Sequence, residues 1–394
     1  MAKKKTTKTS IKKATKKSTK TSSEDISDLE EVDQGEEVEE EQEEQVDQNE
    51  ENDTAPEELA ERSGIENTED FGKASPFVVD SLNYDVKDLP GVGAATLKKL
   101  QDAGYGTLQS IAMTPQKTIM EDTGLGDKTT ASIIQAARDT LHLTYVTADQ
   151  VWERRKYLPR ITTGSEKIDE LIGGGVEVGG ITEFFGEYRT GKTQLCHQLC
   201  VNVQLPRSEG GLEGRALYID TEGTFRPERL IQMAQAKGMN VKDVLKNVFV
   251  IRAHTSQHQV LLVKNAIDTV SEKKINLIVV DSLIAHFRSE YISRGTLATR
   301  QQMMNQHIHD LIRLGNIYPE LAIVITNQVQ AKPDAFFGDP NRATGGHIMA
   351  HASTIRLYLR KGKGEQRIMI VKDAPHLPEG ETVFTITEDG IGDA

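Results

Sequence analysis

The 394-residue sequence is poor in cysteine and lacks any long apolar run. Its two cysteines, Cys196 and Cys200, are too few for a disulfide framework or a structural zinc site. It has no stretch of about 18 apolar residues, the minimum for a helix that crosses a membrane. The lysine-rich N-terminal segment also lacks the apolar core of a secretory signal. We therefore expect a cytoplasmic protein in a reducing compartment, without a membrane partner.

The net charge of -13 is unevenly distributed along the chain. Residues 3–20 hold nine lysines and no acid, whereas residues 24–58 hold nineteen Asp and Glu and no Lys or Arg. These segments carry ten of the thirteen net negative charges, so the rest of the chain is nearly neutral. Because residues 1–58 contain few apolar side chains, we predict a disordered tail, followed by an uncertain linker at 59–81.

Residues 82–142 have the pattern of a small all-α domain. A helix with apolar spacing follows Gly91 and Gly93, and a similar glycine turn 33 residues later opens a second helix. Such turns resemble helix-hairpin-helix elements, in which the amides at Gly91 and Gly93 would bind a DNA phosphate near Lys98 and Lys99. The alternative is that these turns serve only for packing.

From residue 160 to 394, predicted strands and helices alternate. Near-continuous apolar strands of this kind are typical of a mostly parallel, twisted sheet covered on both faces, so the fold class is α/β. Residues 143–159 form a polar linker before it. The predicted strands are 180–185, 216–219, 248–251, 277–280 and 322–326, the helices are 192–204, 227–237, 258–273 and 300–314, and three further strands, read as antiparallel, are 354–360, 366–372 and 382–387.

The segment GEYRTGKT (186–193) fits the P-loop pattern at every fixed position. It follows an apolar strand and opens a helix, which places backbone amides and the positive helix end beside bound phosphates. Lys192 would then meet the β- and γ-phosphates of ATP, and the Thr193 hydroxyl would hold Mg²⁺. The alternative is a glycine turn before an ordinary helix. The predicted nucleotide-binding residues of the loop are Gly186, Glu187, Tyr188, Arg189, Thr190, Gly191, Lys192 and Thr193.

Polar side chains end three other predicted strands. Asp281 follows four apolar residues and would hold Mg²⁺ with Thr193. Hydrolysis also needs a group that orients water, and Glu222 is the candidate, with Asp220 as its rival. Gln328 lies just past the third of these strands, 322–326, where it would sense the γ-phosphate. Acids after strands often only cap turns, and a loop amide is often only solvated.

Several further segments, in one order, resemble the archaeal branch of the RecA/RadA strand-exchange recombinase family. The resemblance runs from about residue 85 to the C-terminus. It implies a RecA-like P-loop core that is a DNA-dependent ATPase, uses ATP and Mg²⁺, and exchanges DNA strands in recombinational repair at the nucleoid. The segments are YIDTEGTFRPERL (218–230), LIVVDS (277–282), SRGTLATRQQ (293–302), TNQVQAKPDAFFGDP (326–340) and GGHIMAHAST (345–354).

The same resemblance implies roles for single residues of the ATP site. It makes Glu222 and Lys192 catalytic, with Gln328 as the nucleotide sensor. Arg229 would lie against the adenine, where a planar guanidinium can stack, and His351 would lie near the γ-phosphate. Asp373 and Pro378 would belong to a cap that a neighbouring subunit lays over ATP. A monovalent cation near Asp373 is a further option.

Two segments would bind single- and double-stranded DNA. Residues 289–302 and 331–346 show no apolar periodicity, and from this alone they could equally be mobile surface loops. The resemblance implies that their arginines and amides hold DNA phosphates without reading the sequence. The candidate DNA-binding residues there are Arg294, Gly295, Arg300, Lys332, Arg342, Gly345 and Gly346.

The linker carries Tyr145 and Ala148, which match an aromatic-x-x-Ala motif that joins subunits into a filament or ring. The family's usual aromatic is Phe, and a buried Tyr hydroxyl needs a hydrogen-bond partner. The alternative is a linker that packs on its own core. A RecA-like regulator and a hexameric helicase also remain open as functions, and recombination mediators are a further candidate class of partner that the sequence does not identify.

Some features carry blander expectations. We expect Cys196 and Cys200 to be buried structural thiols, and His307 and His309 to lie at the surface. The acidic segment of the tail could compete with DNA for the loops or only solvate the chain.

Overall fold

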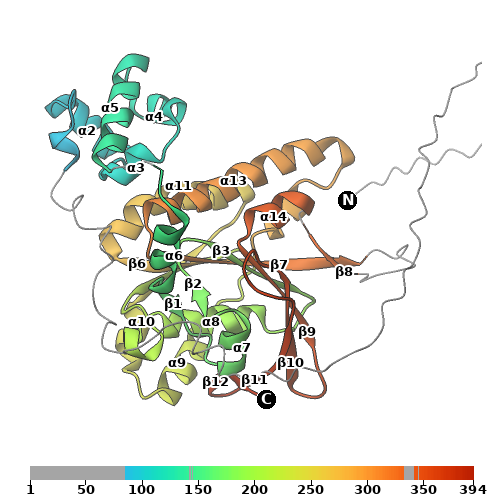
Figure 1. Ribbon diagram of the computed structural model, residues 1–394. Helices are drawn as coiled ribbons and strands as arrows, with labels where there is room; N and C mark the ends of the chain where they lie inside the picture. The colour runs from blue at the N-terminus through green and yellow to red at the C-terminus, as the bar shows by residue number, and fades with distance from the viewer. Residues whose placement is uncertain (1–84, 142, 144, 332–340, 345) are drawn as a thin grey trace, which may run out of the picture. The chain divides into compact units, whose positions relative to one another are not determined.

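The computed structural model describes residues 85–141, 143, 145–331, 341–344 and 346–394 (Figure 1). The predicted disordered tail and the 59–81 linker lie outside these residues, as do Lys332 and Gly345. The remaining chain forms a small helical domain and a large α/β core, and each is described by itself.

The helical domain repeats one backbone feature after 33 residues. Gly91 and Gly124 both have left-handed φ angles, 85° and 64°, which favour glycine. Two residues later, Gly93 and Gly126 begin helices as their N-terminal caps. Apolar residues such as Leu100, Ile111 and Ile133 form a core of its own. The elements are η3 (Val86–Asp88), α2 (Ala94–Asp102), α3 (Leu108–Ala112), α4 (Gln116–Thr123) and α5 (Asp127–Thr140).

The linker holds a helix that its polar sequence did not reveal. Helix α6 (Ala148–Lys156) has no buried residue, so apolar spacing could not predict it. Its start is fixed by Thr147, whose N–H donates to Gln150 Oε1 at 3.0 Å. Near its end, Arg155 donates to both carboxylate oxygens of Glu177, at 3.1 and 3.0 Å, in β2 of the small hairpin β1 (Arg160–Ile161) and β2 (Val176–Glu177).

The core is built on a ten-stranded sheet that is parallel at its centre. Along the sheet the order is β12-β11-β10-β9-β3-β7-β6-β4-β5, and β8 pairs with β7. Strands β9, β3, β7, β6, β4 and β5 run parallel, and the chain then continues from β9 into antiparallel β10, β11 and β12. The strands are β3 (Ile181–Gly186), β4 (Arg215–Asp220), β5 (Val248–Arg252), β6 (Ile275–Asp281), β7 (Ala322–Ala331), β8 (Asn341–Ala343), β9 (Ile355–Lys361), β10 (Gln366–Asp373), β11 (Glu381–Thr387) and β12 (Gly390–Asp393).

Alternate residues of the central strands feed two separate apolar cores. Leu277 and Val279 of β6 pack into one core, and Ile278 and Val280 pack into the other. Helices cover both faces, as the apolar strands predicted (Figure 1). On one face lie α7 (Glu166–Leu171), α8 (Lys192–Asn202), α9 (Pro227–Ala236) and α10 (Val241–Lys246), and on the other α11 (Ser256–Lys273), α12 (Ala285–Glu290), α13 (Leu297–Ile317) and α14 (Gly346–Ala352).

Three expectations about loops and surfaces were wrong. Helix α13 begins at Leu297, three residues before the predicted start at residue 300, so residues 297–302 of the segment predicted as a DNA-binding loop are helical; the first turn is exposed and gives no apolar spacing. The segment 331–346 contains β8, whose pairing with β7 is a tertiary contact that the sequence does not mark. His307 is fully buried, because it shares the inner face of α13 with Met304 and Leu311 at helical spacing.

Candidate functional site

The phosphate loop joins the end of β3 to the start of α8. Gly191, the N-terminal cap of α8, has a φ of 104°, and a Cβ there would lie 2.7 Å from Ile386 Cδ1, so only glycine fits. The ammonium group of Lys192 donates to the carbonyl oxygens of Gly186 and Glu187, at 2.9 and 2.7 Å. Burial lowers the pKa of Lys192, while the charges of neighbouring carboxylates oppose this shift. The loop thus holds its lysine folded back over its own backbone.

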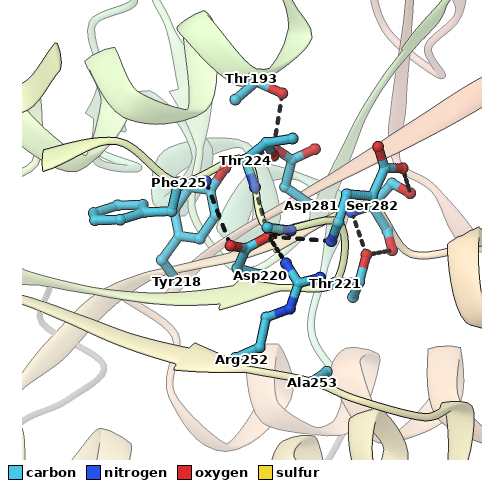
Figure 2. Close-up of polar contacts among 12 residues, drawn as sticks. Thr193, Tyr218, Asp220, Thr221, Thr224, Phe225, Arg252, Ala253, Asp281 and Ser282 are labelled. Carbon is cyan, nitrogen blue, oxygen red and sulfur yellow. Dashed lines mark hydrogen bonds and ion pairs between the residues drawn. The ribbon is translucent and has the colours of Figure 1, made fainter.

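Asp281 lies at the centre of a buried polar cluster at the ends of the strands (Figure 2). Its Oδ2 accepts hydrogen bonds from Thr193 Oγ1 at 2.8 Å and from the Tyr218 hydroxyl at 2.6 Å, and its Oδ1 accepts one from Thr326. Burial and the charge of Asp281 raise the pKa of Tyr218 well above its ordinary value, so the phenol stays a donor. A hydroxyl beside a carboxylate is an oxygen donor pair that fits Mg²⁺, and both predicted metal residues belong to it.

Asp220, the rival of Glu222, is fully engaged in holding a turn. Its carboxylate accepts from Arg252 Nη1 at 3.0 Å (Figure 2). It also accepts from the backbone amides of the four residues 222–225, at 3.1, 2.7, 3.2 and 3.4 Å. Only 6% of Asp220 is exposed. A carboxylate committed to five donors is poorly suited to orient a water molecule, so the geometry favours Glu222.

Glu222 itself is exposed and is reached by single hydrogen bonds. Its Oε1 accepts from Ser282 Oγ at 2.6 Å and from Gln328 Nε2 at 2.9 Å. Ser282 directly follows the metal residue Asp281, and its amide donates to Thr221 Oγ1 at 2.8 Å. Two predicted residues, the candidate for orienting water and the candidate sensor, are therefore in direct contact.

Arg288 extends this contact and was missed in the sequence. Its Nη1 donates to Gln328 Oε1 at 3.0 Å. Arg288 lies on α12, just ahead of segment 289–302, while Gln328 lies on β7, just ahead of segment 331–346. Each segment predicted to bind DNA therefore begins close to a side chain that is connected to Glu222 by hydrogen bonds. The position of Arg288 just before segment 289–302 was the one available signal in the sequence, because no motif includes Arg288.

Arg229 is held by four hydrogen bonds within the chain. Its Nε donates to Gln194 Oε1 at 2.7 Å, and its Nη1 to Gln232 Oε1 at 2.6 Å. The carbonyl oxygens of Glu388 and Thr387 accept two more hydrogen bonds, at 2.7 and 2.8 Å. These contacts fix the guanidinium between α8 and the turn that joins β11 to β12, and its stacking on adenine stays a prediction.

Of the other predicted ATP residues, Thr190 is buried and donates to the carbonyl oxygen of Glu187 at 2.9 Å, whereas five others are exposed. Tyr188 is 82% exposed, and Arg189 lies over its ring at 5.4 Å. His351 is on α14, Asp373 ends β10, and Pro378 lies in the turn before β11; all three are exposed. Their roles across a subunit boundary stay predictions.

The predicted DNA residues lie on several different elements. Arg294 and Gly295 lie in η5 (Arg294–Thr296), Arg342 in β8, and Gly346 begins α14. In the helical domain, Gly91 and Gly93 are exposed, and a Cβ placed on either would meet nothing within 4 Å. In the linker, Tyr145 is 102% exposed and Ala148 is exposed.

Cys196 and Cys200 are buried free thiols, as expected. Within the residues that the structure describes, no three His, Cys, Asp or Glu side chains gather into a metal site. Every helix in that same part of the chain is too short or too polar to span a bilayer.

The fold and the phosphate loop define a RecA-like P-loop protein. The Rad51 family profile matches residues 154–394, and a SAM-like helix-hairpin-helix tandem profile matches residues 84–139. The DNA repair and recombination protein RadA of Aeropyrum pernix is 52% identical over 309 residues, 78% of this chain and 97% of that protein. The protein of the same name from Metallosphaera sedula is 51% identical over 310 residues, 78% of this chain and 95% of that protein.

The chain belongs to the Rad51 family of recombinases. The resemblance to archaeal strand-exchange recombinases is thereby confirmed, together with the fold class and the function of a DNA recombinase.

Proposed function

We propose that this recombinase is a DNA-dependent ATPase that polymerises on single-stranded DNA and uses ATP to control strand exchange. The observation that carries the proposal is the chain of contacts from Glu222 through Gln328 to Arg288. It connects the group that would act on water with both segments that would hold DNA.

ATP would bind at the phosphate loop with Mg²⁺. Lys192 would exchange the carbonyls of Gly186 and Glu187 for the β- and γ-phosphates, since its ammonium needs acceptors in a partly buried site. Thr193 and Asp281 would hold Mg²⁺, which neutralises phosphate charge when bound.

Glu222 would orient the attacking water, because it is the exposed carboxylate of the turn that Asp220 fixes. Gln328 would report the γ-phosphate by changing partners, since its amide group now bonds Glu222 and Arg288. DNA bound at segments 289–302 and 331–346 would then bias both contacts.

DNA would be held through its phosphates. Segments 289–302 and 331–346 offer arginines, and the helical domain offers open glycine amides at Gly91 and Gly93 with exposed Lys98 and Lys99 nearby. Contacts of these kinds position nucleic acid without reading its sequence, as homologous pairing requires.

Assembly is supported by exposed apolar side chains at two places in the chain. Tyr145 and Val146 are exposed in the linker, while Val250 and Ile251 are exposed on β5, the edge strand of the main sheet. An edge strand presents unpaired backbone groups, so β5 is a candidate receptor for the linker of a neighbouring subunit.

The deciding experiment is ATP-dependent strand exchange with purified protein, viewed in parallel by electron microscopy. We expect joint molecules and filaments with ATP and single-stranded DNA. Lys192→Ala should lose ATP-dependent DNA binding and exchange. Closed rings with directional unwinding would instead indicate a helicase, and an ATP-binding protein that forms neither rings nor filaments would indicate a regulator.

A further inference from the structure

His197 lies one helical turn after Thr193 on α8 and is only 1% exposed. It faces the turn that carries Glu222, and no predicted role of the site uses it. Leaving a ring nitrogen of a buried imidazole without a hydrogen-bond partner is costly. Both ring nitrogens of His197 have a polar partner.

The two contacts fix a single tautomer. The Nδ1 atom lies 2.7 Å from the carbonyl oxygen of Thr193, and the amide of Arg226 donates to Nε2 at 3.1 Å. A carbonyl can only accept and a backbone amide can only donate, so the hydrogen is on Nδ1 and Nε2 is bare. Burial also lowers the pKa of His197, which agrees with a neutral ring.

His197 completes the capping of the Glu222 turn. Asp220 accepts the amides of residues 222–225, and His197 accepts the next amide, that of Arg226. Five consecutive amides are therefore held by two buried side chains. Asp220 ties the turn to β4, whereas His197 ties it to α8 and hence to the phosphate loop.

Aromatic packing holds the imidazole in place. Its ring stacks on Phe225 with centroids 5.1 Å apart and planes at 29°, and its centroid lies 5.5 Å from that of Tyr218. Phe225 and Tyr218 meet edge to face at 4.9 Å. Since the Tyr218 hydroxyl donates to Asp281, the ring is packed against the same residue that supports the predicted metal site.

We propose that His197 is a positioning residue that keeps Glu222 at a fixed distance from the phosphate loop through the amide of Arg226. The inference rests on the proposed ATPase. His197 contacts only the backbone carbonyl of Thr193 and neither the Thr193 hydroxyl nor the Lys192 ammonium, so loss of the Arg226 contact should slow hydrolysis without weakening ATP binding. A purely structural histidine would instead affect folding stability, and kcat and KM together.

The test compares His197→Phe with His197→Gln in the full-length protein. Phe keeps an aromatic ring beside Phe225 and Tyr218 but cannot accept a hydrogen bond, whereas the Gln side-chain oxygen can accept from the Arg226 amide. We expect His197→Phe to lower kcat for ATP roughly 3- to 10-fold, as for one lost hydrogen bond, with KM unchanged. His197→Gln should restore kcat to within about two-fold of wild type.

Hydrogen exchange of residues 222–230 without nucleotide provides a readout independent of hydrolysis. Exchange should be faster in His197→Phe and close to wild type in His197→Gln. If His197→Phe does not fold, His197→Leu takes its place, because leucine also cannot accept from the Arg226 amide, and the same fall in kcat with an unchanged KM is expected. An unchanged kcat in His197→Phe, equal loss in both His197 variants, or a parallel rise in KM would overturn the proposal. A wild-type protein with no ATPase activity would contradict the proposed function. The hydrogen-exchange data would still test whether the contact between His197 and the Arg226 amide holds the turn.

Discussion

The candidate ATP site has a buried floor and an exposed rim, which differ in how their side chains are held. On the floor, Asp281 and Asp220 are 4% and 6% exposed and accept three and five hydrogen bonds. On the rim, Glu222 and Arg288 are exposed, and single hydrogen bonds connect them through Gln328. Asp281, Asp220 and Glu222 all lie at the same edge of one sheet, so strand topology alone does not explain the contrast.

The contrast separates what must be rigid from what must respond. A buried carboxylate with all its acceptors engaged resists rearrangement, because each lost partner leaves a desolvated charge. A solvated side-chain hydrogen bond contributes only about 0.5–1.5 kcal/mol. In the proposed mechanism, DNA or a γ-phosphate would therefore replace such a bond at small cost, and binding at the rim would alter hydrolysis.

The largest expected effect is the loss of ATP hydrolysis on replacement of Glu222, the exposed carboxylate next to the buried Asp220. Glu222→Gln should lower kcat by about 10²–10⁴, as for loss of a general base, while ATP binding and filament formation persist. Its stability should change by less than ~0.5 kcal/mol, because the side chain is exposed. Steady-state ATPase assays and urea unfolding measure both quantities.

Asp220→Asn should show the opposite pattern. It replaces a charged acceptor of four amides and Arg252, so unfolding should become easier by roughly 2 kcal/mol. Wild-type hydrolysis by Glu222→Gln would remove that residue from the mechanism. An Asp220→Asn protein with normal stability would show that the floor is not fixed by this carboxylate.

A smaller effect is expected at the rim. Arg288→Met removes the donor to Gln328 Oε1, so ATP turnover in the presence of single-stranded DNA should fall about 3- to 10-fold. Turnover without DNA should stay close to wild type, because the contact between Gln328 and Glu222 remains.

The matched control is Arg207→Met, an arginine paired with Glu320 at the surface. This variant should keep both activities. Equal losses with and without DNA in Arg288→Met would mean that Arg288 supports Glu222 generally and does not connect it to DNA.

The sequence predicted the floor better than the rim. GEYRTGKT and the apolar run before Asp281 are local patterns, and parallel strands bring their ends together, so the phosphate loop and Asp281 could be placed. The choice between Asp220 and Glu222 depended on which carboxylate the turn amides point at, which is a tertiary fact. Arg288 and His197 were missed for the same reason, since their partners lie 40 and 29 positions away.

His307 shows where a local pattern was present and misread. Two histidines two positions apart on a helix face different directions, and the spacing to Met304 and Leu311 places His307 inside. His309, by contrast, is exposed. The ring of His307 accepts from Gln259 Nε2 at 3.1 Å, and the same amide donates to the carbonyl of Leu283, beside Ser282. The buried pair of His307 and Gln259 therefore contacts the backbone two residues after Asp281 and supports the floor of the site from outside.

The smallest effect on turnover, and a distinct one on stability, is expected at His307. Burial lowers its pKa from 6.5 to about 4. Between these values the unfolded chain binds a proton that the folded chain does not, so the free energy of unfolding should fall as pH drops through this window, by up to ~3 kcal/mol. The contribution is constant above pH 6.5.

His307→Phe should remove this pH dependence and keep the ring contact with Phe287, now at 5.9 Å. Urea unfolding across the window measures the difference, with exposed His309→Gln as the control that should behave as wild type. Equal pH dependence in all three proteins would mean that His307 titrates normally, and therefore that water reaches the support of the floor.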